Sequence, residues 1–150
     1  MNKKVILLFF IALSLFSCKK ESETDYLALD IEKITTYLKD NNLEAQRLES
    51  GLFYIISNEG GNDKPTATST VTVSYKGSFF DGDVFDQGSF FTSPLNQLIE
   101  GWIQGIPLIG AAGKIKLFIP STLAYGSGGA GSIPPNTPLI FEVTLHYFSN

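Results

Sequence analysis

The sequence predicts an α+β domain in which an antiparallel β-sheet wraps around one short α-helix. Three observations predict this fold: segments with alternating apolar residues, a short apolar stretch around the single tryptophan, and Gly/Pro-rich loops between them. The chain has 150 residues, of which 43% are hydrophobic and 13% aromatic, so it is long enough for one domain with a core and short extensions. No internal repeat is visible.

The predicted strands are runs rich in β-branched and aromatic residues, several of which alternate with period two. Asp81-Gly82 predicts a hairpin turn between two of them. The glycine-containing stretch 59–65 is interpreted as a plain loop, because no Gly-Lys-Ser/Thr or helix start follows it. The strands are expected at residues 52–57, 71–75, 84–86, 114–120 and 139–148.

The short helix is expected to begin within the stretch Leu95–Trp102, which holds the only tryptophan. A turn that begins near Glu100 would place Leu98, Trp102 and Ile106 on one side before Pro107 ends it. Trp102 would then form the floor of an apolar pocket. Taken alone, the same pattern is also that of an ordinary core tryptophan.

The N-terminal residues have the pattern of a processing segment. Lys3 and Lys4 precede the apolar run 5–16, which is too short to span a bilayer comfortably and fits a secretory signal. The run ends in Leu-Phe-Ser-Cys18, which resembles a bacterial lipobox. We therefore expect a lipoprotein signal peptide at 1–17 and lipidation of Cys18, with an ordinary signal peptide and an incidental cysteine as the alternative. The protein would be exported and lipid-anchored in the cell envelope, on the periplasmic face or at the cell surface.

Three further segments complete the predicted organisation. Residues 18–24 are polar and are expected to form a tether. A helix capped by Thr24 or Asp25 is expected to run to about Asp40, because apolar residues recur there at helical spacing. This helix lies in an extension at 25–47, and the main domain is expected at 48–150.

Charge and composition exclude several classes of function. The formal net charge is −4, and no basic cluster lies outside the extreme N-terminal region, which argues against nucleic acid as a partner. His146 is the only histidine and Cys18 the only cysteine, so a His/Cys metal cluster, a Cys-His pair and a Ser-His-Asp triad are excluded or very unlikely. Neither a metal nor a cofactor is predicted.

Several motifs follow one another in a specific order along the predicted main domain. They are Ser50-Gly51-Leu52, Val71-Thr72-Val73-Ser74-Tyr75-Lys76-Gly77, Asp81-Gly82-Asp83-Val84-Phe85-Asp86, the 95–102 stretch, Ile119-Pro120-Ser121 with Leu123-Ala124-Tyr125-Gly126, and Ile133-Pro134-Pro135-Asn136 through Leu139-Ile140-Phe141-Glu142-Val143. Together these motifs give the chain a resemblance to the FKBP-type peptidyl-prolyl cis-trans isomerase family, over roughly residues 48–148. Its overall look is similar to the lipoprotein form of this family in Bacteroidetes.

The resemblance implies a sheet of five or six strands around a short helix, with a proline pocket between them. It implies isomerisation of Xaa-Pro bonds in proline-containing polypeptides, with macrolides as inhibitors. The implied roles are Trp102 as the floor; Tyr75, Phe85 and Phe141 as aromatic walls; the Ile99 N–H and Tyr125 hydroxyl as donors to peptide carbonyls; Asp86 as an orienting group; and Leu98 and Ile133 as further lining. Taken singly, most of these residues could be ordinary core.

An apolar, aromatic site suits this reaction, because no covalent bond is made or broken. The amide before proline crosses a barrier of about 18–20 kcal/mol, and a few donors that hold the twisted amide better than the planar one lower it.

The sequence also departs from the family pattern. The segment 87–94 is shorter than is usual in the family and contains no basic residue to pair with Asp86. The loop 127–132 is also short. Phe90 and Phe91 are both candidates for an additional wall. Two other hypotheses therefore stay open: a proline-peptide-binding or chaperone module without turnover, and a structural accessory of an envelope complex.

Overall fold

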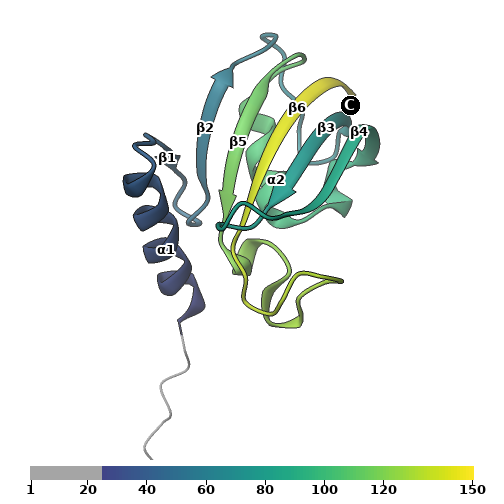
Figure 1. Ribbon diagram of the computed structural model, residues 1–150. Helices are drawn as coiled ribbons and strands as arrows, with labels where there is room; N and C mark the ends of the chain where they lie inside the picture. Colours follow the sequence, from purple (N-terminus) through teal and green to yellow (C-terminus); the bar gives the residue numbers. More distant parts are fainter. Residues whose placement is uncertain (1–24) are drawn as a thin grey trace, which may run out of the picture.

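Six antiparallel strands form one sheet in the computed structural model, which describes residues 25–150 (Figure 1). Along the sheet the strand order is β1-β2-β5-β6-β3-β4. The predicted α+β architecture is confirmed. The predicted signal peptide, Cys18 and the tether lie outside the described residues. The strands are β1 (Gln46–Arg47), β2 (Phe53–Asn58), β3 (Thr70–Ser78), β4 (Val84–Pro94), β5 (Lys114–Ile119) and β6 (Leu139–Ser149).

The strand β4 is longer than the sequence pattern indicates, because it stays paired with β3 as far as Pro94. The pairing is interrupted by a bulge between Val73 and Tyr75, which pair with Phe91 and Gly88. Ser74 therefore faces two residues of β4 instead of one. Such a bulge breaks the period-two pattern, and for this reason only the first three residues of the strand were predictable. The short strand β1 was not predicted.

The helix α2 (Glu100–Gly105) lies on one face of the sheet and carries Trp102. It begins after Ile99, as expected, and passes into a 3-10 turn at Ile106–Leu108 that contains Pro107. The main core lies between this helix and the sheet. Its fully buried side chains include Leu52, Val71, Val73, Leu95, Ile106, Ile109, Leu117, Ile119, Leu139 and Leu145.

The helix α1 (Tyr26–Asp40) covers part of the opposite face of the sheet. Asp25 caps it by accepting a hydrogen bond of 3.1 Å from the Ala28 N–H, as the sequence predicts. A second apolar cluster lies beneath the helix, and its members on β5 and β6 point away from the main core because strand side chains alternate between faces. The cluster consists of Ile34, Leu38, Phe53, Phe118 and Ile140.

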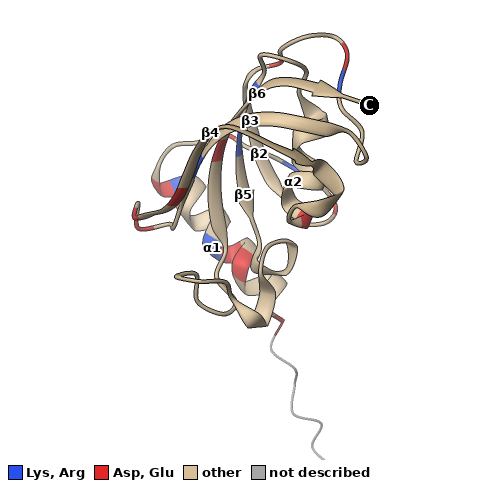
Figure 2. Cartoon of the chain, turned by 90° about the vertical axis from the view of Figure 1, so that its right-hand side faces the viewer, with Lys and Arg blue, Asp and Glu red and all other residues tan. Residues whose placement is uncertain are grey.

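Charged residues are interspersed over the fold (Figure 2). On the outer face of the three central strands, Glu142 contacts Lys76 at 3.1 Å and Lys116 at 3.0 Å. The hydrogen bond from Lys116 lowers the pKa of Glu142, and Lys76 acts in the same direction against the effect of burial. Among residues 25–150, no helix has the length and apolar character needed to cross a membrane.

Candidate active site

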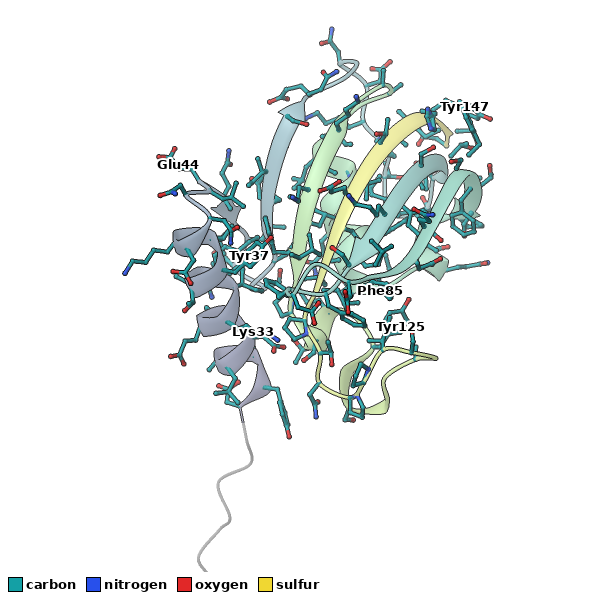
Figure 3. The ribbon with its side chains drawn as sticks, viewed as in Figure 1. Lys33, Tyr37, Glu44, Phe85, Tyr125 and Tyr147 are labelled. Carbon is teal, nitrogen blue, oxygen red and sulfur yellow. The ribbon has the colours of Figure 1, made fainter. Side chains whose placement is uncertain are left out.

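A small cavity lies between α2 and the concave face of the sheet, with a volume of about 180 Å³. Three strands, the helix α2 and two loops contribute to it, so its residues are far apart in the sequence. Figure 3 shows Phe85 and Tyr125 together at the end of the sheet, away from Lys33 and Tyr37 on α1. The residues that line the cavity are Tyr75, Asp86, Phe91, Leu98, Ile99, Trp102, Tyr125 and Phe141.

Trp102 forms the floor of this cavity and is only 4% exposed. The first turn of α2 holds it, with a 2.9 Å hydrogen bond from its N–H to the Ile99 carbonyl. Its ring meets those of Tyr75 and Phe141 edge-on, with centroids 5.2 Å away in both cases. Within residues 25–150, the indole Nε1 is the one buried side-chain nitrogen or oxygen without a hydrogen-bond partner. The base of the cavity is therefore aromatic.

The walls are aromatic rings that contact one another. Phe91 packs against Tyr75 with centroids 5.9 Å apart, and Phe85 packs against Phe141 at 5.5 Å. Two glycines make room for these rings. A Cβ at Gly77 would lie 2.6 Å from the Phe85 ring, and one at Gly88 would lie 2.7 Å from the Tyr75 ring. Neither position tolerates a side chain without displacing a wall of the site.

Polar groups are few at this site, and each lies at the rim. The Tyr75 hydroxyl donates a 2.8 Å hydrogen bond to Oδ2 of Asp86. Burial, followed by this bond to the carboxylate, raises the pKa of Tyr75 to about 12. Burial and, to a smaller degree, the charge of Asp86 raise the pKa of Tyr125. Both phenols therefore keep their protons at neutral pH and remain hydrogen-bond donors.

The structure brings together seven of the nine residues that were predicted to form the pocket. Phe85 lies behind the cavity, against Phe141, and Ile133 is buried in the core nearby, with 8% of its surface exposed. These two residues support the pocket without lining it.

The structure also distinguishes the two phenylalanines of β4. Phe91 lines the cavity, whereas Phe90 is on the other face and stacks on His146 with centroids 4.2 Å apart. The bulge causes this difference, since it places Phe91 opposite the inward-facing Val73. Gly77 and Gly88 were not predicted to matter; a glycine inside a strand, which often marks a close approach of another group, is the signal that could have indicated them.

The comparisons with known proteins agree with this geometry. The model of the FKBP-type peptidyl-prolyl cis-trans isomerase family matches residues 61–146. The chain belongs to this family. Its FKBP domain is 48% identical over 101 residues to the FKBP-type peptidyl-prolyl cis-trans isomerase FkpA of Aeromonas hydrophila, which covers 65% of this chain and 38% of that protein. It is 41% identical over 116 residues to an FKBP-type 22 kDa isomerase of Escherichia coli, covering 73% of this chain and 56% of that protein.

Solved structures of FKBP-type proteins have the same fold. The crystal structure of FkpA from Escherichia coli matches 82% of this chain and 61% of that one, with a TM-score of 0.73 and 36% identity. A peptidyl-prolyl cis-trans isomerase from Pseudomonas syringae matches 82% of this chain and 96% of that one, with a TM-score of 0.71 and 31% identity. The chain thus spans about two fifths to just over half of the length of the curated FKBP relatives above.

Proposed function

We propose that this protein is a peptidyl-prolyl cis-trans isomerase that acts on Xaa-Pro bonds of exported or envelope proteins. The observation that carries the proposal is the aromatic cavity floored by Trp102, in a chain of the FKBP family. Its volume of about 180 Å³ is below the ~300–1,000 Å³ of pockets for drug-sized ligands. That size suits a single ring, such as the pyrrolidine of proline.

The proposed mechanism is non-covalent. The rings of Trp102, Tyr75 and Phe141 hold the pyrrolidine, while the preceding carbonyl rotates near the rim. The planar amide is polarised by resonance, so an apolar surrounding disfavours it relative to the twisted form. Because the twisted amide is the transition state, any group that binds it preferentially raises the rate.

The donors in this proposal are the Ile99 N–H and the Tyr125 hydroxyl, which hydrogen-bond to carbonyls of the bound chain. Ile99 lies directly before α2 and lines the cavity, and the Tyr125 side chain is 40% exposed at its rim. Asp86 accepts a hydrogen bond from the Tyr75 hydroxyl and thereby fixes the Tyr75 ring, which forms one wall. Leu98 adds apolar lining.

An isomerisation assay on a proline-containing peptide tests this function, with Trp102→Ala and Phe141→Ala as pocket variants. We expect both substitutions to remove most of the catalysed rate. Equal rates for the unmodified protein and both variants would exclude isomerisation at this site. A macrolide that places one of its rings in the cavity should inhibit the reaction and change the fluorescence of Trp102.

A second candidate function is binding of proline-containing segments without useful turnover. One observation favours it: residues 87–94 contain no basic side chain for Asp86, which accepts a hydrogen bond from the Tyr75 hydroxyl. Peptide binding, followed by Trp102 fluorescence, in the absence of any catalysed rate would support this candidate over the enzyme.

We also propose that the protein is exported and anchored by lipid at Cys18, as in the lipoprotein form of the family. The lipobox-like sequence and the absence of another cysteine in the chain support this assignment. Cys18→Ala should release the protein from membranes on cell fractionation. Membrane association that is unchanged by this substitution would contradict lipidation.

A further inference from the structure

A carboxylate in the middle of α1 is buried and takes no part in the mechanism above. Asp30 is 4% exposed, and its Oδ2 accepts two hydrogen bonds, both from Ser121. The Ser121 N–H lies 2.7 Å away and the Ser121 hydroxyl 2.5 Å away. Burial of a carboxylate is unfavourable unless donors surround it, so this contact is specific.

Ser121 begins the segment that carries Tyr125 to the cavity. The 3-10 turn Ser121–Leu123 follows β5 after Pro120, and Tyr125 comes two residues after the turn. The Ser121 N–H belongs to the first residue of this turn and has no acceptor within the turn, and Asp30 supplies one. The Ser121 carbonyl in turn accepts a 3.0 Å hydrogen bond from the Ala124 N–H, next to Tyr125.

The other side of Tyr125 is held by a separate contact, because the Asn136 N–H donates a 2.8 Å hydrogen bond to the Gly126 carbonyl. Tyr125 therefore lies between two backbone anchors, and one of them is on the N-terminal helix. Since its side chain is 40% exposed, its position at the rim depends on these anchors more than on packing.

We infer that Asp30 is a positioning residue for the isomerase site: it holds the Ser121 turn and thereby places the Tyr125 hydroxyl at the rim of the cavity. This inference rests on the proposed function and on the proposed role of Tyr125. It makes α1 part of the working site, although the helix lies on the opposite face of the sheet.

The docking of α1 also rests on apolar contacts that are separate from Asp30. Leu38, at the other end of the helix, is 7% exposed and belongs to the cluster with Phe53, Phe118 and Ile140. Leu38→Ala is therefore a matched control, because it weakens the docking of α1 without touching Ser121.

The kinetic experiment compares Asp30→Asn with Leu38→Ala in the full chain, each alone and combined with Tyr125→Phe. We expect Asp30→Asn to lower kcat/KM roughly tenfold, mainly through kcat, because a small misplacement of a donor is costly. With Tyr125→Phe already present, we expect Asp30→Asn to change kcat/KM by less than about twofold, since the two residues then act through the same hydroxyl. Equal losses in both backgrounds, or an equal loss in Leu38→Ala, would overturn the inference.

A second measurement does not depend on activity. Amide hydrogen exchange at Leu123, Ala124 and Tyr125 should become faster in Asp30→Asn, relative to the core of the sheet, and should not in Leu38→Ala. Unchanged exchange in Asp30→Asn would overturn the inference even in an active enzyme. If the unmodified protein shows no isomerase activity but exchange is still faster in Asp30→Asn, the contact between Asp30 and the Tyr125 segment is supported. The proposed isomerase function is then rejected instead.

Discussion

Both faces of the sheet bury apolar and aromatic residues, but these residues are packed differently on the two faces. On the outer face, α1 covers the cluster of Ile34, Leu38, Phe53, Phe118 and Ile140, with Tyr37 packed on Phe80. On the concave face, α2 leaves a cavity of about 180 Å³ beside a larger core. Under α1 these side chains pack directly on one another, whereas on the concave face a gap lined by aromatic rings remains.

The difference comes from the shape of the side chains. Aliphatic residues and edge-on rings fill the space under α1, whereas the Trp102 ring stands nearly perpendicular to the rings of Tyr75 and Phe141 beside a gap. Rigid rings in such an arrangement cannot collapse into the space that they enclose. Variants on the two faces should therefore separate stability from catalysis.

The largest effect is expected for Trp102→Ala. Loss of the floor should lower kcat/KM roughly 100-fold or more, because the pyrrolidine ring of the substrate no longer contacts a positioned surface. The cavity left behind should lower the free energy of unfolding by about 3–5 kcal/mol. Peptide isomerisation and urea denaturation measure the two effects. A variant that is destabilised but fully active would show that the floor is only core.

Gly77→Ala should have the next largest effect on activity. The added methyl group would lie 2.6 Å from the Phe85 ring and 2.8 Å from the Phe141 ring, so a wall of the cavity must move. We expect roughly a tenfold loss of kcat/KM and about 1–3 kcal/mol of stability. Gly61→Ala is the matched control, because its Cβ would make only ordinary contacts at 3.8 Å. Equal behaviour of the two variants would contradict the account of the wall.

Tyr125→Phe should lower kcat/KM by roughly three- to tenfold, without abolishing activity, because one donor to the substrate is lost. Its stability should stay close to that of the unmodified protein, since the hydroxyl is at an exposed rim. Steady-state kinetics and thermal denaturation would check both statements. A complete loss of activity would require a larger role for this hydroxyl than a hydrogen bond.

Leu38→Ala tests the outer face. Removing this buried side chain should lower the free energy of unfolding by about 2–4 kcal/mol. Because Leu38 is remote from the cavity, kcat/KM should change by less than about twofold. Urea denaturation and the isomerisation assay measure these quantities on the same sample. A loss of activity as large as that of Gly77→Ala would remove the distinction between the faces.

The smallest effect is a dependence of stability on alkaline pH. The pKa of Tyr75 is about 12 in the folded protein, compared with 10.0 for an unperturbed tyrosine. The folded state therefore holds this proton more tightly than the unfolded state, and the associated stabilisation is complete below pH 10 and lost as the pH rises toward 12. Urea denaturation between these pH values should show a steeper decline for the unmodified protein than for Tyr75→Phe.

Much of the fold could be predicted from the sequence. Alternation in Val71, Val73 and Tyr75 identified the inward face of β3, and the position of Pro107 located the end of α2. The motifs also indicated seven residues that line the cavity. These features are local, or are carried by ordered motifs, so a single chain is sufficient to find them.

The remainder depends on contacts between distant segments. Phe91 turns inward only because a bulge in β4 changes the alternation, and Gly88 matters only because Tyr75 lies over it. Asp30 belongs to a helix whose sequence pattern marks only the apolar positions, yet it bonds to a residue 91 positions away. No spacing rule connects the two, since the pairing arises when α1 packs against the sheet.

The position of β6 determines when this protein can fold. β6 is the last strand in the sequence, yet it lies in the interior of the sheet, between β5 and β3, and it carries Phe141. A ribosome-bound chain that stops before Leu139 lacks the segment that joins the two halves of the sheet. Such late closure relies on contacts of long sequence separation, which slow folding. The nascent polypeptide should therefore leave the sheet incomplete until β6 has been synthesised.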